Sequence, residues 1–168
     1  MTAGKGIVHG ENFPLVNKDK PNHTRFFQLW LNLPKKSKMV DPCFVMHWAE
    51  TIPILRSKDG LTKINLFAGK LTLPEFTVTY KQKSATNNKQ EEQCATQEST
   101  DTATIEKSVF SALAPPPSSY ASVEDNDVGI YYIQLQPNGR FVLPAAVGGS
   151  SVNRMAYYVE CRILHITR

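Results

Sequence analysis

Short runs of alternating apolar and polar residues, each closed by a turn-forming residue, constrain the fold of this chain most. From Phe27 to Leu33 every second residue is apolar, and Pro34 follows directly. Side chains two residues apart on an extended strand point to the same face, so this pattern predicts a half-buried strand. Proline lacks the backbone N–H that a strand in the middle of a sheet must donate, so the strand is expected to end at Pro34.

Several other segments have the same character. Residues 61–67 alternate in the same way after Ser57-Lys58-Asp59-Gly60, which has strong turn chemistry. Pro137-Asn138-Gly139 predicts the turn of a second hairpin. No segment predicts a helix of ordinary length. The sequence therefore indicates an all-β fold, a barrel or a sandwich, with further strands over residues 44–48, 76–80, 129–135, 140–143 and 155–166.

Residues 81–107 break this pattern. The segment is rich in Lys, Gln, Asn, Glu, Ser and Thr, and Ile105 is its first large apolar residue. Such a composition cannot bury enough apolar area to offset the conformational entropy that ordering costs. We therefore expect a polar, mobile insertion here.

The composition excludes some classes of protein. Lys and Arg exceed Asp and Glu by 19 to 15, and the one tight basic cluster, Lys35, Lys36 and Lys38, adjoins a proline. This pattern favours a solvated turn over a nucleic-acid patch, so direct nucleic-acid binding is not expected. The three cysteines have no C-x-x-C spacing, and no apolar run reaches membrane-span length. We expect a cytoplasmic or nuclear protein without a membrane segment.

Two candidate metal ligands lie near the start of the sequence. His9 and Glu11 are two residues apart and follow Gly4 and Gly6, so on an extended strand they project from the same face. An imidazole and a carboxylate together suit iron, manganese, nickel, copper or zinc. The same spacing also occurs in ordinary surface pairs, so the two residues by themselves leave the site open.

The strings around this pair resemble the pirin family. They are TAGKGIVHGE at residues 2–11, QLWLNLPKKSKMVDP at 28–42, Ile52-Pro53 and SKDG at 57–60. Residues 114–146 and 153–159 resemble the opening of the second pirin barrel. Pirins belong to the bicupins, so the resemblance implies cupin-type barrel elements, also called the double-stranded β-helix or jelly roll. Residues 1–60 would be the later part of the N-terminal cupin barrel, and residues 61–168 the earlier part of the C-terminal one.

The resemblance also implies a metal site. In the family three histidines and one glutamate hold the metal, and His9 and Glu11 align with the third histidine and the glutamate. The other two histidines come from a His-x-His motif, which this sequence lacks. The implied cofactor is Fe(II) or another divalent first-row metal, whose binding is expected to be weakened or lost here. Gln28 and Trp30 would line the pocket, or would simply pack in a strand.

By resemblance the chain is an iron-dependent quercetin 2,3-dioxygenase-type protein that acts on a flavonol-like small molecule, although whether it is an enzyme stays open. One alternative is a non-enzymatic co-regulator that binds a transcription factor-like partner. Another is an inactive fragment, because the pattern of the family is cut at both ends. Incomplete barrels expose unpaired strand edges, so completion of the sheets in a homodimer is also expected.

Overall fold

A computed structural model describes residues 1–79 and 108–160 of the chain. Its regular structure is mainly extended strand, which confirms the all-β expectation in general form. The strands are β1 (Ile54–Ser57), β2 (Thr62–Ala68), β3 (Lys70–Leu73), β4 (Phe76–Thr79), β5 (Ser108–Ser111) and β6 (Ile130–Leu135). The described helical segments are α1 (Lys35–Lys38) and the 3₁₀ turns η1 (Tyr120–Ser122), η2 (Glu124–Asn126) and η3 (Gly149–Ser151).

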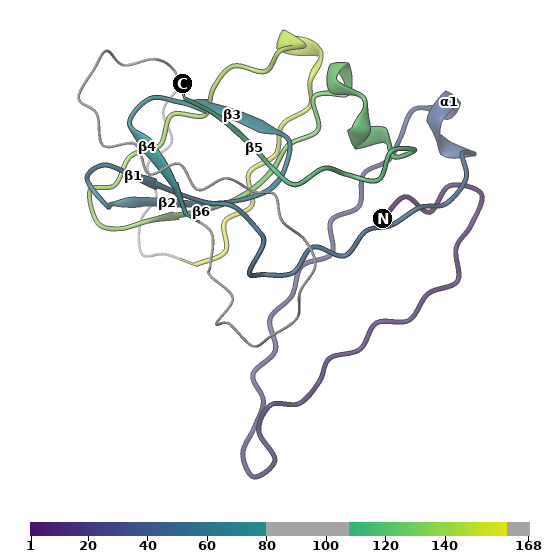
Figure 1. The fold of residues 1–168 in the computed structure, drawn as a ribbon, viewed down its shortest axis with the longest axis horizontal. Helices are drawn as coiled ribbons and strands as arrows, with labels where there is room; N and C mark the ends of the chain where they lie inside the picture. Colours follow the sequence, from purple (N-terminus) through teal and green to yellow (C-terminus); the bar gives the residue numbers. More distant parts are fainter. Residues whose placement is uncertain (80–107, 161–168) are drawn as a thin grey trace, which may run out of the picture.

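The strands form two sheets. The larger sheet has the order β4-β1-β2-β6, and all of its neighbouring strands are antiparallel. The smaller sheet pairs β3 with β5. The strands of the described residues gather in one part of the structure, while residues 1–50 trace a long loop away from them (Figure 1). The chain thus has one compact β region and a long extended N-terminal segment.

The turn between β1 and β2 forms as its sequence predicts. The Ser57 hydroxyl donates a hydrogen bond of 2.5 Å to the Asp59 carboxylate, which also accepts one of 2.9 Å from the Leu61 backbone N–H. Gly60 adopts a φ of 72°, a left-handed conformation that glycine tolerates without steric cost. These hydrogen bonds close the hairpin and keep the pKa of the Asp59 carboxyl below its ordinary value, with the Ser57 hydroxyl as the main cause.

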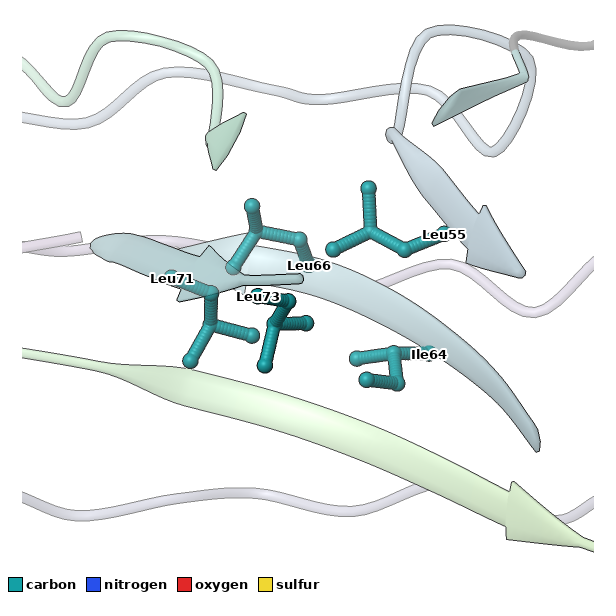
Figure 2. Packing of buried hydrophobic residues seen from close by; sticks show 5 residues of the cluster. All are labelled: Leu55, Ile64, Leu66, Leu71 and Leu73. Carbon is teal, nitrogen blue, oxygen red and sulfur yellow. The ribbon is translucent and has the colours of Figure 1, made fainter. Parts of the chain in front are cut away.

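The hydrophobic core lies between the two sheets. Leu55 of β1 and Ile64 and Leu66 of β2 are fully buried, and they pack with Leu71 and Leu73 of β3 (Figure 2). Burying one such side chain contributes about 1.5–3 kcal/mol. The partly buried side chains around this cluster are Phe76, Phe110, Ala112, Tyr131, Ile133 and Phe141.

The predicted strand over residues 26–33 is wrong for the described structure. No strand is present there, and the side chains of Phe27, Leu29 and Leu31 are 63%, 55% and 62% exposed. The predicted strand at residues 44–48 is absent as well, and Phe44 and Trp48 are exposed. A strand forms only when a neighbour receives its hydrogen bonds, and alternation of side chains does not supply one.

The C-terminal expectations are met in part. The predicted turn is present, with the Gly139 backbone N–H donating to the Gln136 carbonyl at 2.8 Å. Residues 140–143 form no strand and instead touch β2 through a hydrogen bond of 2.9 Å from the Thr62 hydroxyl to the Arg140 carbonyl. Residues 155–160 form no strand either. The rest of that predicted strand and the predicted insertion at 81–107 lie outside the described residues.

Two further expectations are affected by the structure. The basic cluster predicted as a loop is the single-turn helix α1, in which the Ser37 backbone N–H donates to the Pro34 carbonyl at 2.8 Å.

The predicted boundary between residues 60 and 61 falls in the turn of the β1–β2 hairpin, and the two-part division of the chain remains a prediction. In the described part of the chain, no helix has the length and apolar character needed to cross a membrane.

We predict that Ile64→Ala lowers the free energy of unfolding by about 2–5 kcal/mol, because it leaves a cavity in a fully buried position. Val142→Ala is the control, since Val142 is 83% exposed, and should change it by less than about 0.5 kcal/mol. Urea unfolding followed by circular dichroism measures both. Equal effects of the two substitutions would contradict the described core.

We further predict that Ser57→Ala raises the pKa of Asp59 toward its ordinary value of 3.8. Because the folded pKa is lowered, the stabilisation is present above the unfolded pKa and is lost as pH falls through the folded pKa. The stability difference between wild type and Ser57→Ala should therefore shrink in acid. An NMR titration of the Asp59 carboxyl carbon and unfolding between pH 7 and about pH 3 test this. An unchanged Asp59 pKa in the variant would contradict the assigned hydrogen bond.

Candidate metal-binding pair

The glycine-rich N-terminal segment is tied to residues 40–43. Thr2 and Cys43 exchange two backbone hydrogen bonds of 2.7 and 3.0 Å, and the Lys5 backbone N–H donates to the Val40 carbonyl at 3.0 Å. The Lys5 ammonium also pairs with Asp41 at 2.8 Å. These contacts fix the chain just before the candidate ligands.

Gly4 is required by this close approach. Its φ is +53°, and a Cβ atom at this position would lie 2.1 Å from the Val40 carbonyl oxygen. Gly10, by contrast, has open space around the position of a Cβ atom. The first glycine therefore serves the contact with residue 40, while the glycine between the two candidate ligands is not needed for packing in the described structure.

His9 and Glu11 face one another, as their spacing predicts. The His9 Nε2 atom lies 4.0 Å from a Glu11 carboxylate oxygen, and the two side chains are 43% and 50% exposed. The donor atoms suit a first-row divalent ion in their chemistry. Their number does not, since catalytic zinc sites, for comparison, use three protein ligands. Within residues 1–79 and 108–160, no group of three or more His, Cys, Asp or Glu side chains could hold a metal ion.

The other histidines do not complete the pair in the described structure. His23 is exposed and His47 is half-buried, and neither forms a potential metal-binding group with His9 and Glu11. His165 lies outside the described residues.

Gln28 and Trp30 contact each other through their side chains. The Trp30 indole N–H donates to the Gln28 side-chain oxygen at 2.8 Å, and the Trp30 side chain is 87% exposed. Two hollows in the described residues, one at 16–20 and one on β1, β2 and β6, contain neither residue. The pocket-lining role remains a prediction.

The chain between Glu11 and Gln28 is folded back on itself, a feature that the sequence did not lead us to predict. Asn17 donates its backbone N–H to the Asn22 side-chain oxygen at 2.8 Å, and the Asn22 side-chain amide donates to the Asn17 carbonyl at 2.8 Å. The rings of Phe13 and Phe26 meet with centroids 5.2 Å apart. The two arms of the long N-terminal loop in Figure 1 are thus held at its closed end. The asparagine pair was the available signal, because asparagine side chains often hydrogen-bond to nearby backbone.

Comparisons with known proteins find relatives over part of the chain. A pirin-like protein of Arabidopsis thaliana is 39% identical over 70 residues, which are 42% of this chain and 22% of the relative. Rat pirin is 44% identical over 62 residues, or 37% of this chain and 19% of the relative. A putative quercetin 2,3-dioxygenase of Thermoplasma acidophilum is 37% identical over 76 residues, which cover 41% of this chain and 29% of the relative.

The chain spans about a fifth of the length of the first two of these curated relatives and under a third of the third. No family model matches the sequence. No solved structure matches it either.

We predict that Gly4→Ala breaks the contact with residues 40–43, because the new methyl group would overlap the Val40 carbonyl and the left-handed φ strains any other residue. The Lys5 amide, which donates to Val40, should then lose protection in hydrogen exchange by about tenfold or more. Gly10→Ala is the matched control and should leave that protection unchanged. Equal protection in both variants would contradict the described contact.

Proposed function

Because the chain is similar to pirins over about two fifths of its length, we propose that it is a pirin-like cupin metalloprotein that binds Fe(II) or another divalent first-row metal. The observation that carries the proposal is the pairing of His9 with Glu11 at 4.0 Å, inside a string that resembles the metal-binding motif of the family. His9 would offer a neutral imidazole nitrogen and Glu11 a carboxylate oxygen.

The closed N-terminal loop supports this assignment. Phe13 and Phe26 bring the two arms of the loop into contact, with ring centroids 5.2 Å apart. If the arms pair in the register set by Phe13 and Phe26, Glu11 lies opposite Gln28 and His9 lies opposite Trp30. All four side chains are then on one face, because they are spaced by two residues. This register would place the predicted pocket residues beside the predicted ligands.

The two described donors must be supplemented for a metal to bind. His23, His47 or a histidine of a second copy of the chain are the candidates for the missing ligands. A bound metal with an open coordination position would supply Lewis-acid and redox chemistry. In that setting Trp30 would offer an apolar surface to a flat, flavonol-like substrate, and Gln28 would offer an amide for hydrogen bonding. The activity proposed is that named for the Thermoplasma relative, quercetin 2,3-dioxygenation.

The same proposal extends to the fold. The paired antiparallel sheets and the core between them suit the walls of a cupin barrel, in which two sheets of short strands face each other. We propose that residues 1–60 contribute to the first barrel of the bicupin pattern and that residues 61–168 contribute to the second, with residues 81–107 as an insertion between strands.

A second candidate function is that of an interaction protein in the nucleus or cytoplasm. The observation that favours it is the exposure of apolar side chains on the extended segment 26–33, where Phe27 and Leu31 are more than 60% exposed. An extended segment of this kind can add to the sheet of another protein, because its backbone groups form no backbone hydrogen bonds with the rest of the described residues. The partner would be a second copy of the chain or a transcription factor-like protein.

We predict that the purified chain, loaded anaerobically with Fe(II) and dialysed, retains metal through His9 and Glu11. His9→Ala and Glu11→Gln should each lower the metal content about tenfold or more, because each removes a ligand. Glu50→Gln is the matched control, since Glu50 is an exposed carboxylate outside the pair. Metal content is measured by mass spectrometry of the digested protein. Wild-type content far below one equivalent, or content unchanged by His9→Ala, would refute the metal assignment.

A further inference from the structure

A row of polar side chains crosses three strands on the face of the larger sheet that points away from the core. Arg56 of β1 lies opposite Lys63 of β2, and Lys63 lies opposite Gln134 of β6. Leu55, which precedes Arg56 on β1, and Ile64, which follows Lys63 on β2, are both in the core cluster. Because successive side chains of a strand point to opposite faces, the row lies on the other side of the sheet.

The two cations of this row are held close together. Pro53 and Leu66 continue the β1–β2 register by one residue beyond Ile54 and Asn65. The Leu66 backbone N–H donates to the Pro53 carbonyl at 3.0 Å, so Pro53 and Leu66 are a hydrogen-bonded pair. Hydrogen-bonded and non-hydrogen-bonded pairs alternate along an antiparallel ladder, so Arg56 and Lys63 form a non-hydrogen-bonded pair, in which opposed side chains are closest. Two like charges directly opposite destabilise a sheet.

The carboxylates of the neighbouring turns form no ion pair with these cations in the described structure. Asp59 accepts hydrogen bonds of 2.5 and 2.9 Å from a hydroxyl and a backbone N–H of its own turn. Glu75 lies 4.0 Å from Lys58. Among the ion pairs of the described residues, none includes either cation of the row. Within residues 1–79 and 108–160, no ion pair therefore engages the charge of Arg56 or Lys63.

A hollow of about 280 Å³ lies on this row, and its lining contains no carboxylate among the described residues. Its polar side chains are rich in N–H donors, five on the arginine, three on the lysine and two on each glutamine. Its lining residues are Arg56, Gly60, Leu61, Lys63, Gln134 and Gln136.

We propose that this hollow binds an oxyanion, a phosphate or carboxylate group, between Arg56 and Lys63. An arginine fork donates two parallel hydrogen bonds to either group, and a lysine adds a point charge. The bound anion would offset the repulsion between the two cations, which no ion pair of the described residues compensates. The proposal is independent of the metal assignment, because it involves neither His9 nor Glu11.

The test is calorimetric titration of the full chain at low ionic strength, with inorganic phosphate in one arm and succinate in the other. Low ionic strength is used because salt screens exposed charges. Arg56→Gln and Lys63→Gln should each weaken binding about tenfold or more, since each removes a charge-assisted hydrogen bond. Lys58→Gln is the matched control, because it removes the same charge from the adjoining turn, outside the hollow.

Tighter binding of phosphate than of succinate, with loss in both hollow variants and none in the control, supports a phosphate-bearing ligand. The reverse preference with the same pattern of variants supports a carboxylate ligand. Absence of heat from either anion in the wild-type chain overturns the proposal. Equal weakening by Lys58→Gln also overturns it, because attraction would then depend on net charge alone.

Discussion

The packing of β2 against β3 is the interaction on which the rest of the described structure depends. Ile64 and Leu66 are fully buried against Leu71 and Leu73, and the strands on either side of β2 are in place because they pair with it. β2 has β1 on one edge and β6 on the other. Apolar burial supplies the free energy, and the backbone ladder sets which residues face the core.

The extended N-terminal segment shows what happens to the same pattern without a partner. Residues 26–33 alternate as regularly as residues 61–67, yet only the second group forms a strand. The difference lies in the neighbours, since β2 is hydrogen-bonded on both edges, whereas Phe27 and Leu29 stay more than half exposed. Such a segment is suited to pairing with another strand. Gln28 and Trp30, the residues predicted to line a pocket, belong to this same exposed segment.

The two candidate binding sites differ in how they arise. His9 and Glu11 are brought together by local geometry, because the extended backbone turns residues two apart to one side. Arg56, Lys63 and Gln134 are brought together by strand register, over a sequence distance that no local rule spans. Reasoning from the sequence could thus predict that His9 and Glu11 face each other, but not that Arg56, Lys63 and Gln134 lie in one row. For the row of Arg56, Lys63 and Gln134, the signal available in the sequence was the hairpin turn at residues 57–60, which brings Arg56 and Lys63 onto neighbouring strands.

The sequence by itself determined the strand character of the chain, the hairpin turn stabilised by Ser57 and Asp59, and the facing of His9 and Glu11. These features depend on residues a few positions apart, whose geometry the backbone restricts to a few states. The tertiary structure alone decided which alternating segments become strands, which face of β2 is buried and which described side chains lie near the His9–Glu11 pair. Those outcomes depend on hydrogen-bond partners and apolar neighbours that lie far away along the chain.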